Sequence, residues 1–299
     1  PLQHPQDSIF IAGNFNDWNP HNSAYVLSQG DENILSLYTK LPAGEYEFKC
    51  TRGGWKKAEC QDHGIEMENH EFEIYSDTTI EINVEAWKDD FIGVSRKHSA
   101  GKQVHIMDTA FYMPQLNRYR RIWVYLPEGY TASQKHYPVL YMQDGQNIFD
   151  AATSAFGEWG VDECLDSLIR LGRPASIVVG IDNGPQRLNE YNPYEFQNFG
   201  KGEADQYLAF ITETLKHFID KQYRTLSGKE NTLIAGSSMG ALLAYYAMLK
   251  KPDVFGKAGI FSPTFWAAPG IRSLTDSLAA KNNGKFFFYM GEREGASYI

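Results

Sequence analysis

The pattern of hydrophobic and polar positions changes near residue 105, and the two parts of the chain predict different folds. Up to about residue 87, the two kinds of residue alternate in short stretches that clusters of Gly, Asn, Asp and Pro separate, as in half-buried antiparallel strands. No segment with a helical period interrupts them. The first part is therefore expected to be a small all-β, immunoglobulin-like sandwich of residues 1–88. Its expected strands are Ser8–Ala12, Leu35–Tyr38, Tyr46–Lys49, Glu71–Tyr75 and Thr79–Val84.

A polar linker of residues 89–104 follows, and residues 105–299 then alternate between strand-like and helix-like segments. This alternation predicts an α/β domain with a mainly parallel sheet that is covered on both faces. The expected strands are Arg121–Leu126, Tyr137–Met142, Ser176–Ile181, Thr232–Gly236, Lys257–Phe261 and Lys285–Tyr289. The expected helices are Gly157–Leu171, Ala204–Ile219 and Ser238–Lys250.

Residues 236–240 read Gly-Ser-Ser-Met-Gly, between an apolar strand and a run of helix formers. This spacing is that of a nucleophile elbow, in which small residues two before and two after the serine allow a tight strand-to-helix turn. The pattern predicts Ser238 as a nucleophile. The alternative is a tight Gly-Ser turn without chemistry.

A serine nucleophile needs two amides that stabilise an oxyanion, and one usually follows the nucleophile while the other follows an earlier strand. Met239 is expected to supply the first amide. Gln146, in the loop after the strand that ends at Met142, is expected to supply the second. The alternative for this loop is a simple turn between a strand and a helix.

The acid that orients the base is expected after the strand Lys285–Tyr289, where Glu292 and Glu294 are available and Glu294 is favoured by its reach. An exposed loop glutamate is the alternative. In such folds the base is a histidine that follows the acid, yet all eight histidines precede Ser238. We therefore expect the base in a C-terminal segment that this sequence does not include, and a pseudoenzyme is the alternative.

Four further residues near the predicted strand ends are candidates for substrate binding: Asp144, Trp159, Arg187 and Tyr191. The alternative is that an Arg–Glu surface pair lies beside packed aromatic rings. No group of His, Cys and Asp has the spacing of metal ligands, so neither a metal nor an organic cofactor is expected.

The charge and the distribution of apolar residues argue against two classes of partner, nucleic acid and the membrane interior. The net charge of −9 argues against nucleic acid, and no stretch of the sequence has the length of unbroken apolar residues that a membrane span needs. The chain opens at Pro1 without a signal segment, which suggests a trimmed N-terminus. Cys50 and Cys60 bracket a predicted hairpin turn, so a disulfide is an alternative to the favoured reduced thiols.

The second part resembles the esterase D and enterochelin esterase branch of the α/β-hydrolases, which includes feruloyl and acetyl-xylan esterases. The resemblance is carried by residues 141–150, 178–183, 187–194, 236–240 and 261–266. It implies an α/β-hydrolase fold, with Ser238 as nucleophile and Glu294 as acid.

The first part is similar to the starch- and glycogen-binding modules that precede many α-glucan enzymes, on residues 13–20, 44–49 and Trp55. This resemblance implies that Trp18, Trp55 and Lys49 contact a sugar, because flat indoles match pyranose faces and an amine donates to hydroxyls. A buried core tryptophan at position 18 is the alternative.

Together, these features predict a serine carboxylic ester hydrolase that acts on a carbohydrate ester and is secreted or periplasmic. The alternatives are a siderophore ester as substrate, a noncatalytic carbohydrate-binding protein and a protein-interaction scaffold. The oligomeric state is not predicted.

Overall fold

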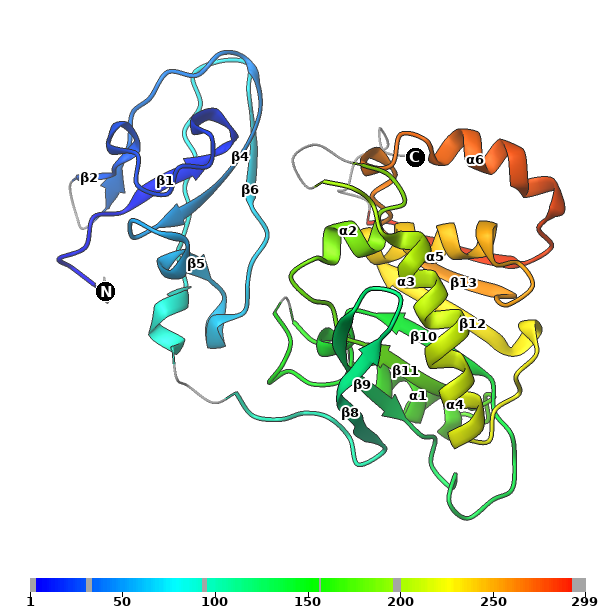
Figure 1. Cartoon of the computed structure of the whole chain (residues 1–299). Coiled ribbons are helices and arrows are strands. Elements are labelled where there is room, and N and C mark those ends of the chain that lie inside the picture. Colours follow the sequence, from blue (N-terminus) through cyan, green and yellow to red (C-terminus); the bar gives the residue numbers. More distant parts are fainter. Residues whose placement is uncertain (1–3, 31–33, 93–95, 156, 196–199, 292–299) are drawn as a thin grey trace. The chain divides into compact units, whose positions relative to one another are not determined.

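The computed structural model describes residues 4–30, 34–92, 96–155, 157–195 and 200–291. The chain divides into two compact units (Figure 1). The first contains residues 1–97 and 154–157, and the second contains residues 98–153 and 158–299. Within the described ranges, no helix combines the length and hydrophobicity that crossing a bilayer requires.

The first unit is a small β-sheet domain, as the alternating pattern predicts. Its central sheet is antiparallel and has the order β1-β4-β6, and two short pairs, β2-β3 and β5-β7, flank it. The side chains of Ile11, Phe48 and Trp87 lie in its core. The strands are β1 (Phe10–Gly13), β2 (Ser28–Gln29), β3 (Leu35–Ser36), β4 (Gly44–Thr51), β5 (Glu59–Cys60), β6 (His70–Ile74) and β7 (Ala86–Trp87). Short 3-10 helices connect them: η1 (Asn14–Asn16), η2 (Ser23–Tyr25), η4 (Trp55–Lys57), η5 (Asp62–Gly64) and η6 (Lys88–Phe91).

The expected strand over residues 79–84 is wrong, because this segment belongs to no sheet. Ile82 and Val84 still pack against the core of the unit. The alternation of apolar and polar residues therefore indicated which side chains pack against the core. A strand also requires a neighbouring backbone with free hydrogen-bonding groups, which the alternation does not reveal.

The three cysteines are free thiols, which confirms the favoured reduced state. Cys50 and Cys60 are buried and Cys164 is exposed. Burial raises the pKa of the Cys60 thiol to about 11 and raises that of Cys50 well above its ordinary value.

The second unit is an α/β domain (Figure 1), and its sheet is seven-stranded and mostly parallel. The strand order is β14-β13-β12-β10-β11-β9-β8, and only the β8-β9 and β9-β11 pairs are antiparallel. The strands are β8 (Val104–Met113), β9 (Arg118–Tyr125), β10 (Val139–Gln143), β11 (Ile177–Ile181), β12 (Thr232–Ser237), β13 (Lys257–Phe261) and β14 (Lys285–Tyr289).

The α-helices among the described residues of this unit are α1 (Val161–Arg170), α2 (Arg187–Tyr191), α3 (Ala204–Ala209), α4 (Lys216–Gln222), α5 (Met239–Lys250) and α6 (Ile271–Leu278). The π-helical turn η9 (Phe210–Leu215) joins α3 to α4, so one continuous helix extends beyond the expected end at residue 219. The 3-10 helices are η7 (Gly145–Asn147), η10 (Lys229–Asn231), η11 (Phe265–Ala267) and η12 (Ala279–Lys281).

Alternate residues of the strands enter two separate cores. On β9, Ile122 and Val124 pack with residues of α3, α4 and α5, whereas Trp123 and Tyr125 pack with the α1 side of the sheet. This is the period of two that a sheet covered on both faces requires. β10 lies between β11 and β12, so the chain passes from β10 to the neighbour on one side and later to the neighbour on the other side. Ligand sites of α/β proteins form where the strand order reverses in this way, at the carboxyl ends of the strands.

Several expected elements of the second unit differ from the structure. Strand β8 was not predicted, because it is an edge strand whose side chains are mostly exposed and show little hydrophobic alternation. Helix α1 begins at Val161 instead of Gly157, since Gly157 and Gly160 have φ angles of 88° and 61°, outside the helical region. The short helices α2 and α6 were also not predicted.

Candidate active site

Ser238 lies in the sharp turn between β12 and α5. Its φ and ψ angles are 56° and −120°, a combination that residues with a side chain adopt only under strain. The Ser238 amide donates to the Phe261 carbonyl at 3.0 Å, and the Ser238 carbonyl accepts from Ala241 at 3.1 Å. Neighbouring strand and helix therefore hold the serine in this conformation, as a nucleophile elbow requires.

The elbow requires glycine at Gly236 because its backbone lies very close to that of Gly240. A Cβ atom on Gly236 would lie 2.5 Å from the carbonyl carbon and oxygen of Gly240, much closer than carbon atoms pack. The sequence analysis expected small residues here because the strand-to-helix turn is tight, and the close approach of Gly236 to Gly240 agrees with this reason.

The Met239 amide is at the first position of α5, where an N–H group has no acceptor within the helix. It is thus available to an oxyanion next to Ser238. Gln146 lies in η7, directly after β10, and its side-chain oxygen accepts from the Asn183 amide at 3.1 Å. The Gln146 backbone amide remains the predicted second donor.

Ser238 and Met239 line a pocket of about 210 Å³ in the second unit. Of the residues predicted to bind substrate, Arg187 also lines it. The sequence analysis did not single out the remaining lining residues one by one, although most of them belong to the segments 187–194 and 261–266 that carried the family resemblance. The other lining residues are Leu188, Asn189, Asn192, Tyr194, Gly200, Thr264, Trp266 and Ala267.

Asp144 and Tyr191 act on this pocket through Arg187. The Asp144 carboxylate accepts from Arg187 Nε at 2.7 Å and from Arg187 Nη2 at 2.8 Å. The Arg187 guanidinium also lies over the Tyr191 ring, 5.1 Å from its centroid. Burial alone would lower the pKa of Arg187, but the bonds to Asp144 raise it, so the guanidinium keeps its charge.

Trp159 faces a different hollow. Its ring makes an edge-to-face contact with Phe261 at 5.3 Å and is 43% exposed. It lines a space of about 530 Å³ along the α1 side of β12, β13 and β14, together with Leu140, Ala235 and Phe287. The structure therefore does not bring Trp159 into the pocket of Ser238.

Glu294 and its alternative Glu292 lie outside the described residues. In the part of the chain that the structure covers, hydrogen bonds of histidine rings involve His4, His70, His98 and His105, and none of them joins a histidine ring to Ser238.

In the first unit, Trp18 and Trp55 lie side by side with ring centroids 6.3 Å apart. Trp55 is 41% exposed, and Trp18 is half-buried rather than a core residue. Lys49 is buried, and its amine donates to the Met67 carbonyl. Of the three residues predicted to contact a sugar, the two tryptophans form an accessible pair, whereas the lysine amine is occupied within the unit.

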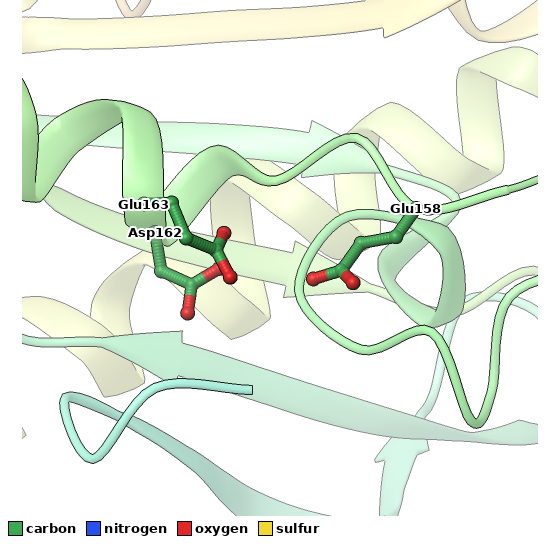
Figure 2. A group of neighbouring side chains, drawn as sticks. All are labelled: Glu158, Asp162 and Glu163. Carbon is green, nitrogen blue, oxygen red and sulfur yellow. The ribbon is translucent and has the colours of Figure 1, made fainter. Parts of the chain in front are cut away.

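The carboxylates of Glu158, Asp162 and Glu163 meet at the start of α1 (Figure 2). One oxygen of each lies within 4.8 Å of the others, and carboxylate oxygens are the ligands that hard cations prefer.

The fold and the elbow define an α/β-type serine hydrolase. Residues 114–289 match the family model described as "Putative esterase", and the chain belongs to this esterase family. Residues 7–87 match the pullulanase X25 domain model.

Two curated relatives act on different esters by name. The chain is 28% identical over 185 residues to an endo-1,4-beta-xylanase/feruloyl esterase of Xylanibacter ruminicola, covering 60% of this chain and 24% of that protein. It is 29% identical over 170 residues to the ferri-bacillibactin esterase BesA of Bacillus subtilis, covering 49% of this chain and 56% of that protein. The chain thus spans less than two thirds of either relative.

A solved structure shows the same fold. The BES protein of Bacillus cereus is 21% identical and superposes with a TM-score of 0.53, covering 67% of this chain and 78% of that one. At this identity the likeness concerns the fold alone.

Proposed function

We propose that the protein is a serine carboxylic ester hydrolase that removes acyl groups from carbohydrate esters. The observation that carries the proposal is the strained Ser238 at the N-terminus of α5, open to a pocket of about 210 Å³. A serine in this conformation presents its Oγ to a bound carbonyl, and the helix amides behind it favour developing negative charge.

In the proposed reaction, Ser238 Oγ attacks the ester carbonyl carbon and gives its proton to a base. The tetrahedral oxyanion is held by the amides of Met239 and Gln146. Collapse breaks the bond to the alcohol oxygen, which leaves protonated, and water then cleaves the acyl-enzyme to release a carboxylic acid and free serine. Loss of one such oxyanion donor typically raises the barrier by about 3 kcal/mol.

We assign Glu294 as the carboxylate that orients the base. A histidine completes triads of this kind, and the histidines of this sequence all precede Ser238. Activity is therefore best measured both on the 299-residue chain and on the full-length natural protein.

The carbohydrate part of the proposal is supported by both units. The chain is similar to a protein named as a xylanase/feruloyl esterase. The first unit matches a pullulanase domain, and the chain is 34% identical over 83 residues to an alpha-amylase of Niallia circulans, covering 27% of this chain and 6% of that protein. The paired rings of Trp18 and Trp55 offer a stacking surface for a sugar. A polymeric substrate would place the enzyme outside the cytoplasm, as a secreted or periplasmic protein.

A siderophore ester is the second candidate substrate, because BesA of Bacillus subtilis is named as a ferri-bacillibactin esterase. Such a substrate would use the pocket of Ser238 but would not need the tryptophan pair of the first unit.

The test is hydrolysis of p-nitrophenyl acetate, feruloylated arabinoxylan and a catecholate trilactone by the wild type and by Ser238→Ala. We expect Ser238-dependent hydrolysis, with preference for the feruloylated polysaccharide. Preference for the trilactone would overturn the carbohydrate assignment. Absence of Ser238-dependent turnover in the full-length protein on all three would overturn the esterase assignment and favour a noncatalytic binding protein.

Sugar binding by the first unit has its own test. Retention on insoluble starch and xylan is expected to fall with Trp55→Ala, while the exposed Tyr75→Ala serves as control. Equal retention of the two variants would assign the unit a purely structural role.

A further inference from the structure

The acidic group at the start of α1 consists of Glu158, Asp162 and Glu163. Figure 2 shows the Glu158 carboxylate pointing toward the paired carboxylates of Asp162 and Glu163. Asp162 is only 1% exposed. An ionised carboxylate in such a position needs a partner, because burial of an uncompensated charge is unfavourable.

In both Asp162 and Glu158, one carboxylate oxygen accepts a hydrogen bond and the other oxygen does not. The Gly101 amide donates to Asp162 Oδ2 at 2.8 Å, and the Ser99 hydroxyl donates to Glu158 Oε2. Asp162 Oδ1 and Glu158 Oε1 are buried and have no hydrogen-bond partner among the described residues. Carboxylate oxygens only accept, so these two need either a proton or a cation.

Within the described residues, no Lys, Arg or His side chain supplies this positive charge. None of the ion pairs found in the described part of the chain includes Glu158, Asp162 or Glu163.

We propose that Glu158, Asp162 and Glu163 bind a calcium ion, which is held by Asp162 Oδ1, Glu158 Oε1 and an oxygen of Glu163. Ser99 and Gly101 orient two of these ligands from outside, as donors around metal-binding carboxylates commonly do. The sequence analysis expected no metal, since these three acids follow no ligand motif.

The chemistry of the ligands selects the ion. Calcium takes six to eight oxygen ligands at about 2.3–2.6 Å in flexible geometry, which suits carboxylate oxygens that lie within 4.8 Å of one another. Magnesium demands near-ideal octahedral geometry at about 2.0–2.1 Å and gives up its waters reluctantly, so a group of three protein carboxylates suits it less well. Zinc favours nitrogen and sulfur ligands, which this group lacks.

The ion would fasten the segment that enters the second unit to helix α1. Ser99 also accepts from the Ala151 amide at 2.7 Å, and the Trp159 amide, next to Glu158, donates to the Asn147 carbonyl at 2.9 Å. One cation would thus connect residues 99–101, the loop after η7 and the first turn of α1. Its main effect is expected on stability.

The experiment measures thermal unfolding in EDTA and in calcium chloride, together with terbium luminescence excited through tryptophan. We expect calcium to raise the Tm of the wild type, and terbium to bind and be displaced by calcium. Trp159→Phe should reduce the luminescence but keep the calcium-dependent Tm shift, because Trp159 neighbours a ligand without being one.

Asp162→Asn is expected to abolish the calcium-dependent Tm shift, whereas Asp253→Asn, on an exposed turn, should keep it. Should Asp162→Asn fail to fold, Glu163→Gln decides. Changes around metal ligands weaken binding about 10- to 100-fold, so loss of a direct ligand should weaken calcium binding by at least about tenfold.

Two results would overturn the proposal. The first is a wild type whose Tm is unaffected by calcium and which binds no terbium; the carboxylates would then share a proton. The second is a calcium shift of equal size in the wild type, Asp162→Asn and Glu163→Gln, which would place the ion elsewhere. Both readouts are independent of esterase activity.

Discussion

Arg187 and Asp144 form a two-point ion pair beside the pocket of Ser238, with Nε–Oδ1 and Nη2–Oδ2 distances of 2.7 and 2.8 Å. Asp144 also accepts from Asn183 Nδ2 at 2.6 Å. Arg187 connects the loop after β10 to helix α2, and it presents its remaining surface to the pocket.

Replacing Arg187 by lysine is expected to destabilise the protein by about 1–2 kcal/mol, because an ammonium group cannot reproduce the two parallel bonds and the contact with the Tyr191 ring. Urea unfolding measures this change. Where esterase activity is present, KM should rise more than kcat falls. Arg170→Lys, at the exposed end of α1, is the matched control. Equal stability of Arg187→Lys and the control would show that the pair has no structural weight.

Gly236→Ala is expected to abolish Ser238 activity and to lower stability by about 3 kcal/mol or more, since its Cβ would lie 2.5 Å from Gly240 backbone atoms. Gly54→Ala is the control, because no atom lies within 4 Å of the added Cβ. Thermal unfolding and labelling of Ser238 by a fluorophosphonate distinguish the two. An active, stable Gly236→Ala protein would contradict the tight elbow.

Asp150 is expected to give a pH-dependent contribution to stability. Burial would raise its pKa, but hydrogen bonds from His98 Nδ1, the Ala152 amide and the Ser99 amide bring the pKa below the ordinary 3.8. A depressed pKa stabilises the fold above about pH 3.8, and this contribution disappears as the pH falls through the lower, folded-state value.

Asp150→Asn should therefore be less stable than the wild type by about 1–2 kcal/mol at neutral pH, and the difference should shrink below pH 4. Urea unfolding across this pH range measures it. A difference that stays constant with pH would show that the carboxylate charge is not involved.

The thiols are expected to react in two groups. Cys164 is exposed, whereas Cys50 and Cys60 are buried with raised pKa values, so few thiolates form there. In the native protein a disulfide reagent should label one thiol rapidly, and Cys164→Ser should remove this phase. In urea all three should react. Rapid labelling of two or three native thiols would contradict the buried positions.

The order of elements in the second unit could be predicted from the sequence because its central strands and long helices are buried and strongly patterned. The elbow was equally visible, since its two glycines and serine follow from local backbone geometry. Edge strand β8 and the short helices α2 and α6 were missed, because exposed or brief elements leave little hydrophobic pattern.

Contacts between distant segments could not be predicted in the same way. The sequence suggested Asp144, Arg187 and Tyr191 as separate substrate contacts, but the fold makes Asp144 and Tyr191 the supports of Arg187. Trp159 was grouped with them, and the sheet places it along another hollow. Proximity in the chain to a strand end does not tell on which face of the sheet a side chain emerges.

The sequence by itself determined the two fold classes and the tight turn around Ser238, because hydrophobic periodicity and the glycine-serine spacing act over a few residues. The tertiary structure alone decided which side chains share the pocket of Ser238, that Lys49 is buried, and that Glu158, Asp162 and Glu163 converge with Ser99 and Gly101. These relationships join residues that are far apart in the chain or face one another only after the loop folds back, and no local pattern records them.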